Sequence, residues 1–132
     1  MKLTLPYPPT INHYYAKCKN GKLRIGERGK QYRLAVLLHK KQLRLKQILG
    51  PIQVTIHMIP PDYRRRDSDN LLKCLLDSLN KAKLIEDDSM IVDLQILKHK
   101  PDAQDDSGKV IVHIAPVYPA DVEVRDAGAW IV

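Results

Sequence analysis

Carboxylates crowd into one short stretch of a chain that is otherwise strongly basic. Asp67 and Asp69 follow three consecutive arginines, and Glu86, Asp87 and Asp88 come about twenty residues later. Carboxylate oxygens are the ligands that Mg²⁺ prefers, and this ion usually keeps several waters. Two or three aspartates from separate segments can therefore hold Mg²⁺ beside a phosphate, where it can generate a hydroxide or stabilise a leaving oxygen. The stretch favours metal-assisted chemistry on a phosphate ester.

Asp67 and Asp69 also have a purely structural explanation. The apolar repeat that follows them predicts a helix, and negative charge near a helix N-terminus contributes about 0.3–1 kcal/mol. One of the two can therefore be an N-cap and the other a solvated neighbour. This explanation accounts for one carboxylate, and it leaves the second and the three that follow residue 85 unexplained.

The polar residues around these aspartates suit the same chemistry. Arg64, Arg65 and Arg66 can position a phosphate and offset the local negative charge. Asn70, Lys73 and Asp77 are spaced i, i+3 and i+7, so they share one stripe of the expected helix. On that stripe Asn70 can bind a ligand oxygen and Lys73 can contact a scissile phosphate. The alternative for Lys73 is an ordinary surface ion pair with Asp77, worth a few tenths of a kcal/mol.

The charge distribution indicates a polyanionic partner. The net charge is +7, and residues 16–50 carry eleven Lys or Arg against one acid, Glu27. The basic segment favours binding of a nucleic acid. The acidic, arginine-flanked segment that follows it favours a chemical centre separate from that binding surface. The basic residues expected to contact DNA lie on a predicted hairpin and helix: Lys22, Arg24, Lys40 and Lys41. The alternative is that these charges only promote solubility.

Other kinds of site have little support. The five histidines are scattered, and the two cysteines, Cys18 and Cys74, have neither zinc spacing nor a disulfide framework. Two Pro-Asp pairs resemble the opening of a PD-(D/E)xK nuclease motif, but no ExK or DxK follows them. No stretch is long and apolar enough for a membrane span, and no signal peptide is evident, so we expect a cytoplasmic protein.

The elements that must position these residues follow from the apolar patterns. Gly50-Pro51 is expected to end the first of two main helices, whose buried face comprises Leu34, Leu37, Leu38, Leu45 and Ile48. Leu71, Leu72, Leu75, Leu76 and Leu79 give the second its buried face. Strands are expected at residues 2–5, 52–58, 92–96 and 109–115, a hairpin turn at Asn20-Gly21, and helices at 28–49 and 69–83. The last two strands are expected to form an antiparallel hairpin. The chain should be a single α+β domain with a mixed or antiparallel sheet.

The central stretch closely resembles the signature of the RusA family of Holliday junction resolvases. That signature reads D-x-D-N-x-x-K-x-x-x-D-x-L followed by an acidic pair, and it corresponds here to Asp67, Asp69, Asn70, Lys73, Asp77, Leu79 and Asp87-Asp88. The opening PYPPTINHYY, which includes Asn12, is similar to the start of that family. The resemblance covers residues 1–115, and we assign no role to the extension at 116–132.

The resemblance implies a dimeric, Mg²⁺-dependent endonuclease, with Mn²⁺ able to substitute, that cuts four-way DNA junctions by paired nicks and is often encoded by phages and prophages. It implies that Asp67, Asp69 and Asp88 are catalytic metal ligands, that Asp87 is a further ligand, and that Lys73 is catalytic. Asn12, Asn70 and the basic residues are then the expected DNA contacts. A homodimer also follows from the substrate, because two symmetric cuts need two sites. The rival reading is a basic DNA-binding module without catalysis.

One difficulty concerns the length of the second helix. A helix over residues 69–83 is roughly 20 Å long, so Asp88 starts at the end away from Asp67 and Asp69. The chain must fold back, the helix must end early, or a second copy must complete the site. The sequence does not distinguish these three arrangements.

Overall fold

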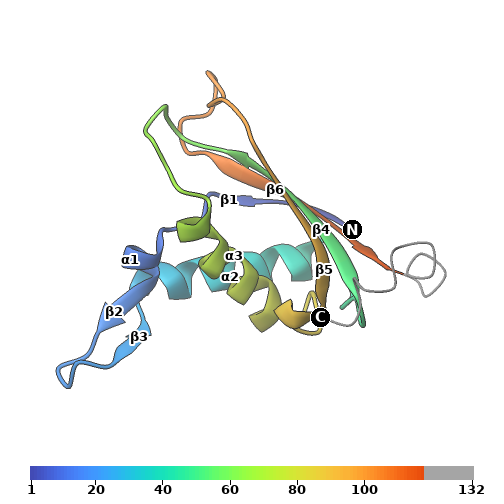
Figure 1. Cartoon of the computed structure of the whole chain (residues 1–132), viewed down its shortest axis with the longest axis horizontal. Coiled ribbons are helices and arrows are strands. Elements are labelled where there is room, and N and C mark those ends of the chain that lie inside the picture. The colour runs from blue at the N-terminus through green and yellow to red at the C-terminus, as the bar shows by residue number, and fades with distance from the viewer. Residues whose placement is uncertain (118–132) are drawn as a thin grey trace.

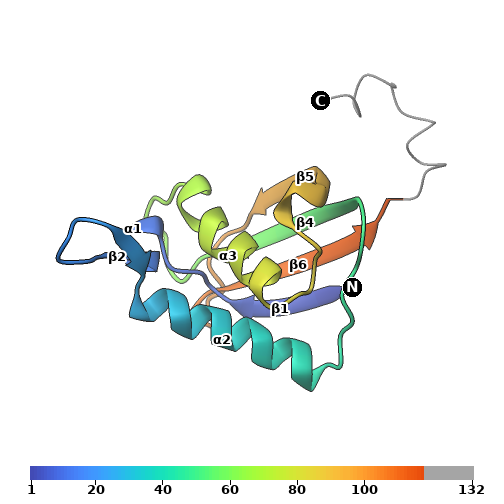
Figure 2. The same cartoon turned by 90° about the horizontal axis from the view of Figure 1, so that it is seen from below.

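The computed structural model describes residues 1–117, and these residues form two layers (Figure 1). One layer is a four-stranded mixed sheet, and the other consists of helices that cover one face of that sheet (Figure 2). A two-stranded hairpin projects beyond the layers at the start of the longest helix. The predicted α+β class and the mixed sheet are confirmed.

The elements follow one another in an order that alternates between the layers. The chain forms β1 (Lys2–Pro6), α1 (Ile11–Tyr14), β2 (Tyr15–Lys17), β3 (Leu23–Ile25), α2 (Glu27–Gln42), β4 (Ile52–Ile59), α3 (Asp69–Lys81), the 3₁₀ helix η1 (Asp88–Met90), β5 (Ile91–Lys98) and β6 (Lys109–Pro116). The hairpin predicted at Asn20-Gly21 is confirmed as β2 and β3, with Gly21 in the left-handed region at φ 81°.

The strand order is β1-β6-β4-β5, and this corrects one prediction. The expected hairpin between the last two strands is wrong, because β4 lies between them. β4 pairs parallel with β5 and antiparallel with β6. The α3 segment provides the crossover that a parallel pair needs. The carboxyl ends of β4 and β5 therefore meet at one edge of the sheet.

The core lies between the helix layer and the inner face of the sheet. Alternate residues of β4 point into it, which confirms the predicted half-buried strand: Ile52, Val54, Ile56 and Met58 are at most 2% exposed. From α3, Leu71, Leu75 and Leu79 are buried with Cys74 and Ser78, whereas Leu72 and Leu76 of the predicted face are half-buried. The Ser78 hydroxyl donates to the Cys74 carbonyl at 2.7 Å, which satisfies it inside the core.

The prediction for the first long helix was wrong in its end and only partly right in its buried face. Leu37, Leu45 and Ile48 pack against the core as predicted, whereas the other two leucines do not. α2 ends at Gln42 instead of residue 49, and Arg44 has a left-handed φ of 51°, which stops the helix. Its buried residues are Gly29, Tyr32 and Val36, while Leu34 and Leu38 are 55% and 47% exposed. The small Gly29 lets α2 approach Tyr14 closely, and that contact decides which face turns inward.

Three further observations bear on the predictions. Both cysteines are free thiols, Cys18 half-buried and Cys74 buried. No helix within residues 1–117 is long and apolar enough to cross a membrane. The domain boundary expected at residue 115 stays a prediction, and most of the expected extension, residues 118–132, lies outside the described part of the chain.

Candidate active site

Asp67 and Asp69 lie exposed at the start of α3. The Asp67 carboxylate accepts a hydrogen bond from the backbone N–H of Asp69 at 3.2 Å, so it caps the first turn in part. Ser68, the formal N-cap residue, makes no side-chain cap. Neither aspartate is the N-cap residue, so the capping explanation holds only as this one turn contact of Asp67. Asp69 lies in the first turn, where negative charge is favoured, but its carboxylate has no capping role.

The three arginines before α3 are not equivalent. Arg66 is half-buried, and its guanidinium pairs with Asp62 at 2.8 Å and lies 5.7 Å from the centre of the Tyr7 ring. The hydrogen bond from Arg66 is the largest cause that holds the pKa of Asp62 below its ordinary value. Arg64 and Arg65 are exposed. Arg66 thus stabilises the loop through its contacts with Asp62 and Tyr7, whereas the side chains of Arg64 and Arg65 lie on its surface.

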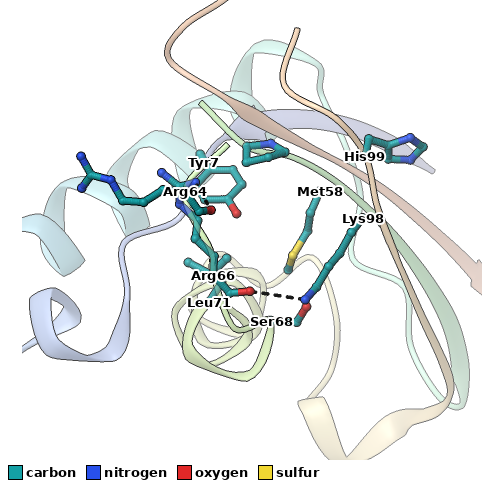
Figure 3. A pocket seen from close by; sticks show the side chains of 9 residues that line it. Tyr7, Met58, Arg64, Arg66, Ser68, Leu71, Lys98 and His99 are labelled. Carbon is teal, nitrogen blue, oxygen red and sulfur yellow. Dashed lines mark hydrogen bonds between the residues drawn. The ribbon is translucent and has the colours of Figure 1, made fainter. Parts of the chain in front are cut away.

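A cavity of about 100 Å³ opens beside this loop (Figure 3). Its floor is apolar and includes Met58 and Leu71, and Tyr7 stands on one side. The Lys98 ammonium points across it and donates to the Arg66 carbonyl at 3.4 Å. A second hollow continues the first past Tyr63, whose exposed fraction is 81%. We call the two together the basic groove, after the four cations that line it beside His99: Arg64, Arg66, Lys98 and Lys100.

Sequence reasoning found the arginines of the basic groove and missed Lys98, His99 and Lys100. These residues lie more than thirty positions after Arg64 and carry no local motif. The parallel pairing of β4 with β5 brings the two segments to the same edge of the sheet. A prediction of that pairing would have found them.

The exposed face of α3 carries the predicted polar stripe. Asn70 is exposed, and the Lys73 ammonium lies 3.3 Å from Oδ1 of Asp77, which is the ion pair that the structural alternative for Lys73 predicts. This hydrogen bond is the largest cause that raises the pKa of Lys73, followed by the charge of Asp77, and the charge of Asp88 adds a smaller contribution. Lys73 is therefore a cation paired with Asp77 and within the electrostatic influence of Asp88.

Asp87 and Asp88 lie where the chain turns from α3 into β5. Asp87 caps η1 by accepting from the backbone N–H of Ser89, and it also accepts from the Asn80 amide at 3.0 Å. The Ser89 hydrogen bonds are the largest causes that lower the pKa of Asp87. Asp88 is exposed in η1. Asp87 thus has a structural role, whereas Asp88 faces outward on the side of Lys73.

The structure answers part of the difficulty about the position of Asp88. α3 ends at Lys81, only two residues before the expected end, and it is about 18 Å long. Asp67 and Asp69 begin this helix and Asp88 follows its other end. Within residues 1–117 of one copy, no group of three or more His, Cys, Asp or Glu side chains could hold a metal ion. One copy therefore brings Asp88 toward Lys73 without forming a closed metal site.

The remaining predicted DNA contacts fall into separate places. Lys22 and Arg24 are exposed on the hairpin, at the N-terminal end of α2 (Figure 2). Lys40 and Lys41 lie in the last turn of that helix, and the Lys40 ammonium donates to the Lys83 carbonyl at 3.2 Å. Asn12 is exposed on α1, which contacts α3. These residues do not form one continuous patch.

Three histidines come together on the open face of the sheet, although they are scattered in the sequence. His57 and His99 are hydrogen-bonded at 2.8 Å between ring nitrogens, and the His113 ring lies 5.8 Å from that of His57. Their positions on β4 and β6 confirm that His57 and His113 are strand-face residues.

The fold and the site define a class of small α+β protein in which one helix presents carboxylates, an asparagine and a lysine beside a basic groove. A family model described as endodeoxyribonuclease RusA matches residues 6–115. Crossover junction endodeoxyribonuclease rusA of Enterobacteria phage HK97 is 38% identical over 99 residues, which cover 74% of this chain and 81% of the phage protein.

Further relatives give the same result. RusA of Escherichia coli strain K12 is 38% identical over 97 residues, covering 73% of this chain and 80% of its own length. The protein of Enterobacteria phage 82 is 37% identical over 98 residues, with the same two coverages. The chain belongs to the RusA family of endodeoxyribonucleases, and it is therefore an enzyme of the nuclease class. The family resemblance of the sequence is confirmed, and the phage relatives agree with its expected association with phages.

Proposed function

We propose that the protein is a structure-selective endonuclease that resolves four-way DNA junctions by paired, symmetric nicks with the help of Mg²⁺. The observation that carries the proposal is the exposed face of α3. There Asp69, Asn70, Lys73 and Asp77 share one side of the helix, Asp67 precedes it, and the basic groove opens beside its first turn. The relatives are named crossover junction endodeoxyribonucleases, and we take a DNA junction as the substrate from those names.

The donor chemistry of the aspartates suits a hard divalent cation. Asp67, Asp69 and Asp88 are exposed and offer carboxylate oxygens, which Mg²⁺ or Mn²⁺ accepts together with water and phosphate oxygens. Asp87 is a weaker candidate because its oxygens already accept from Ser89 and Asn80. A bound Mg²⁺ supplies an activated water and stabilises the leaving oxygen.

The other residues of the site act on the DNA itself. Lys73 is a cation whose charged form is further favoured by Asp77, which raises its pKa, and it can offset negative charge that develops on the phosphate in the transition state. Asn70 and the exposed Arg64 and Arg65 can bind neighbouring backbone oxygens. The basic groove extends this contact, and its exposed Tyr63 suits a base that is unstacked at a branch point.

A homodimer accounts for the paired cuts and for the open metal site. β5 is an edge strand, and it exposes Val92, Leu94 and Leu97 at 39–41%. A strand at the edge of the sheet of residues 1–117 that exposes apolar side chains favours association with a second copy. Asp88 lies just before this strand, so pairing there would bring the Asp88 of each copy to the interface. We propose that Asp88 of one copy then completes the site of the other.

A DNA substrate also sets the surroundings in which the enzyme works. The partner is branched DNA, and the reaction is cytoplasmic. The junction arms that extend beyond the site would be contacted by Asn12, Lys22, Arg24, Lys40 and Lys41. Because these residues lie on α1, on the hairpin and in the last turn of α2, we expect them to contact different arms.

The main alternative is a basic DNA-binding module without catalysis. The capping contacts of Asp67 and Asp87 are its specific support, because they give both carboxylates a structural role. It leaves Asp69 and Asp88 unexplained.

The test uses a labelled mobile four-way junction and a matched linear duplex, with wild type and Asp67→Asn, each in Mg²⁺ and in EDTA. We expect paired nicks on the junction only, from wild type only, and in Mg²⁺ only, with junction binding retained by the variant. Tight binding without nicks in either Mg²⁺ or Mn²⁺ would support the non-catalytic module. Undiminished cutting by pure Asp67→Asn would remove that residue from the site.

A further inference from the structure

A series of hydrogen-bonded polar side chains, which we call the polar chain, connects three helices and ends at Lys73. Arg33 of α2 donates to the Tyr14 hydroxyl of α1 at 2.6 and 3.0 Å. That hydroxyl donates to Oδ2 of Asp77 on α3 at 3.1 Å. The other oxygen of Asp77, Oδ1, lies 3.3 Å from the Lys73 ammonium. Tyr14 and Asp77 are 63 positions apart, so only the fold brings them together.

The donors and acceptors of this chain fix its direction. A guanidinium has only donors, so the Tyr14 oxygen must accept both contacts from Arg33. Its single proton is then left for Asp77, whose Oδ2 is an acceptor. Because Oδ2 is engaged, Oδ1 faces Lys73. The carboxylate is thus oriented from behind, and its orientation places the ammonium.

The packing around Tyr14 makes it a firm anchor. Its side chain is fully buried, and the carbonyl of the same residue accepts from the Gly26 N–H at 2.8 Å. Gly29 of α2 approaches so closely that an added Cβ would lie 2.7 Å from the Tyr14 ring. Burial raises the pKa of Tyr14 to about 12, so the hydroxyl keeps its proton at neutral pH. Exposure then rises outward along the chain, to 20% for the Asp77 side chain and 49% for that of Lys73.

A purely structural role would explain the inner half of this chain and not the outer half. A buried hydroxyl needs a hydrogen-bond partner, and Arg33 alone provides one for Tyr14. An exposed Lys–Asp pair contributes little to stability. The additional contact from Tyr14 to Asp77 instead limits where a flexible lysine can place its charge, and it does so on the side where Asp88 lies.

We propose that Arg33, Tyr14 and Asp77 are positioning residues that hold the Lys73 ammonium ready for the phosphate of the DNA. The inference rests on the proposed function, since it assumes that Lys73 acts on the phosphate. Preorganised charge avoids reorganisation at the moment of reaction, and small displacements of such a group can slow a reaction by up to about 100-fold.

The first experiment measures Tyr14→Phe, which removes the hydroxyl and keeps the ring. Single-turnover cleavage of a four-way junction at saturating enzyme should be about 10-fold slower, while the Kd for the junction changes less than about 2-fold. Tyr32→Phe is the matched control, because the buried Tyr32 hydroxyl also donates one hydrogen bond, to the Pro6 carbonyl at 2.7 Å. That hydrogen bond does not belong to the series that leads from Arg33 to Lys73. Tyr32→Phe should cleave at the wild-type rate even if it is less stable. Equal slowing by both variants would show a structural effect only.

The second experiment is a double-mutant cycle with Lys73→Met. If Tyr14 acts through Lys73, adding Tyr14→Phe to Lys73→Met should not slow cleavage further. Multiplication of the two effects would overturn the positioning role. Asp77→Asn should behave like Tyr14→Phe in both backgrounds.

The cycle also separates the failure of this inference from that of the proposed function. Wild-type cleavage by Lys73→Met would remove the lysine from the proposed mechanism. A slow Lys73→Met combined with a fast Tyr14→Phe would keep the mechanism and reject the positioning residues.

Discussion

The two ends of the exposed face of α3 are built in different ways. Lys73 and Asp77 are tied through Tyr14 and Arg33 to two other helices, and Tyr14 is fully buried. Asp67 and Asp69 are exposed, and the one hydrogen bond that the described structure gives their carboxylates is the Asp67 cap. The Lys73 ammonium is therefore held in place, through Asp77, by contacts with other helices, whereas the carboxylates of Asp67 and Asp69 have no such contacts with other elements of the described structure.

This difference suggests a division of labour. A lysine has a long, flexible side chain whose ordering costs up to about 2 kcal/mol, so it gains most from being held beforehand. The aspartates are short and repel one another until a cation lies between them, so a ligand or a second copy can order them. Stability and activity should then separate: changes at the aspartate end affect activity, and changes at the anchored end affect both.

The largest effect is expected at the aspartate end. Asp67→Asn and Asp88→Asn should each lower cleavage by about 10³-fold, because a metal ligand supports several kcal/mol of charge stabilisation. Both residues are exposed, so the free energy of unfolding should stay within about 0.5 kcal/mol of wild type. Junction cleavage and urea denaturation of the same preparations measure the two quantities.

Mixing these two variants tests whether a second copy completes the site. If Asp88 acts in the partner's site, a mixed dimer holds one intact site and one that lacks both aspartates. Refolding the variants together should therefore restore nicking, with single nicks in place of paired ones. A mixture that stays inactive, although each variant binds the junction, would place Asp67 and Asp88 in the same copy's site.

The next effect should appear at the anchored end. Gly29→Ala puts a Cβ 2.7 Å from the Tyr14 ring and 2.8 Å from its carbonyl oxygen. Overpacking of this kind costs about 1–3 kcal/mol, more than the gain in helix propensity. Gly26→Ala is the control, because its nearest neighbours would lie at 3.4–3.5 Å and its effect should stay below about 1 kcal/mol. Equal unfolding free energies for the two variants would mean that Tyr14 is not tightly held.

The same two ends differ in how far the sequence predicted them. The carboxylates, the arginines and the α3 stripe are local patterns, so their types and spacing were enough to identify them. Tyr14 and Arg33 lie in other helices, and their roles depend on how α1 and α2 pack against α3. A single sequence holds no local signal for such a contact.

Packing also explains the errors in the fold. Leu34 and Leu38 of α2 were predicted to face inward but are exposed, because the contact of Gly29 with Tyr14 turns the neighbouring face of the helix inward. The loop between β5 and β6 favoured a hairpin, yet β4 takes the place between them because it pairs with both. α3 was predicted nearly to the residue because its buried face and its polar face are both continuous. The continuous pattern of α3 and the local turn at Asn20-Gly21 were predicted correctly, whereas the inward face of α2 and the pairing of β5 depended on contacts with distant segments and were not.

A smaller effect should distinguish the DNA contacts near the site from those away from it. Each phosphate contact adds about 0.9 to the slope of log K against log salt, so removing two cations should lower that slope by about 2 and weaken binding roughly 10-fold. We expect this for Lys98→Ala with Lys100→Ala in the basic groove, and for Lys22→Ala with Arg24→Ala on the hairpin. Fluorescence anisotropy with a junction at several salt concentrations measures both pairs.

The two pairs should differ in cleavage. Loss of the groove lysines should also slow single-turnover cleavage at saturating enzyme, because Lys98 lines the same cavity as Ser68 and Leu71 at the start of α3. Loss of the hairpin cations should weaken binding alone. An unchanged salt slope for the groove pair would move the DNA path away from the aspartate end.

The smallest effect concerns the anchored end at high pH. The pKa of Tyr14 is raised from 10.0 to about 12, chiefly because the side chain is buried. A raised pKa means that the folded state keeps the proton longer, so the contribution of Tyr14 to stability is complete below pH 10 and is lost as the pH rises toward 12. Burial also raises the pKa of Cys74 to about 12 and that of Tyr32 well above 10.0, so wild type should lose stability at high pH from these groups as well as from Tyr14. Urea denaturation at pH 9, 10 and 11 should give a shallower loss for Tyr14→Phe than for wild type, while Tyr63→Phe, at an exposed position, should match wild type. Equal slopes for all three proteins would mean that the Tyr14 hydroxyl is reached by water, and the anchored end would then be no firmer than the aspartate end.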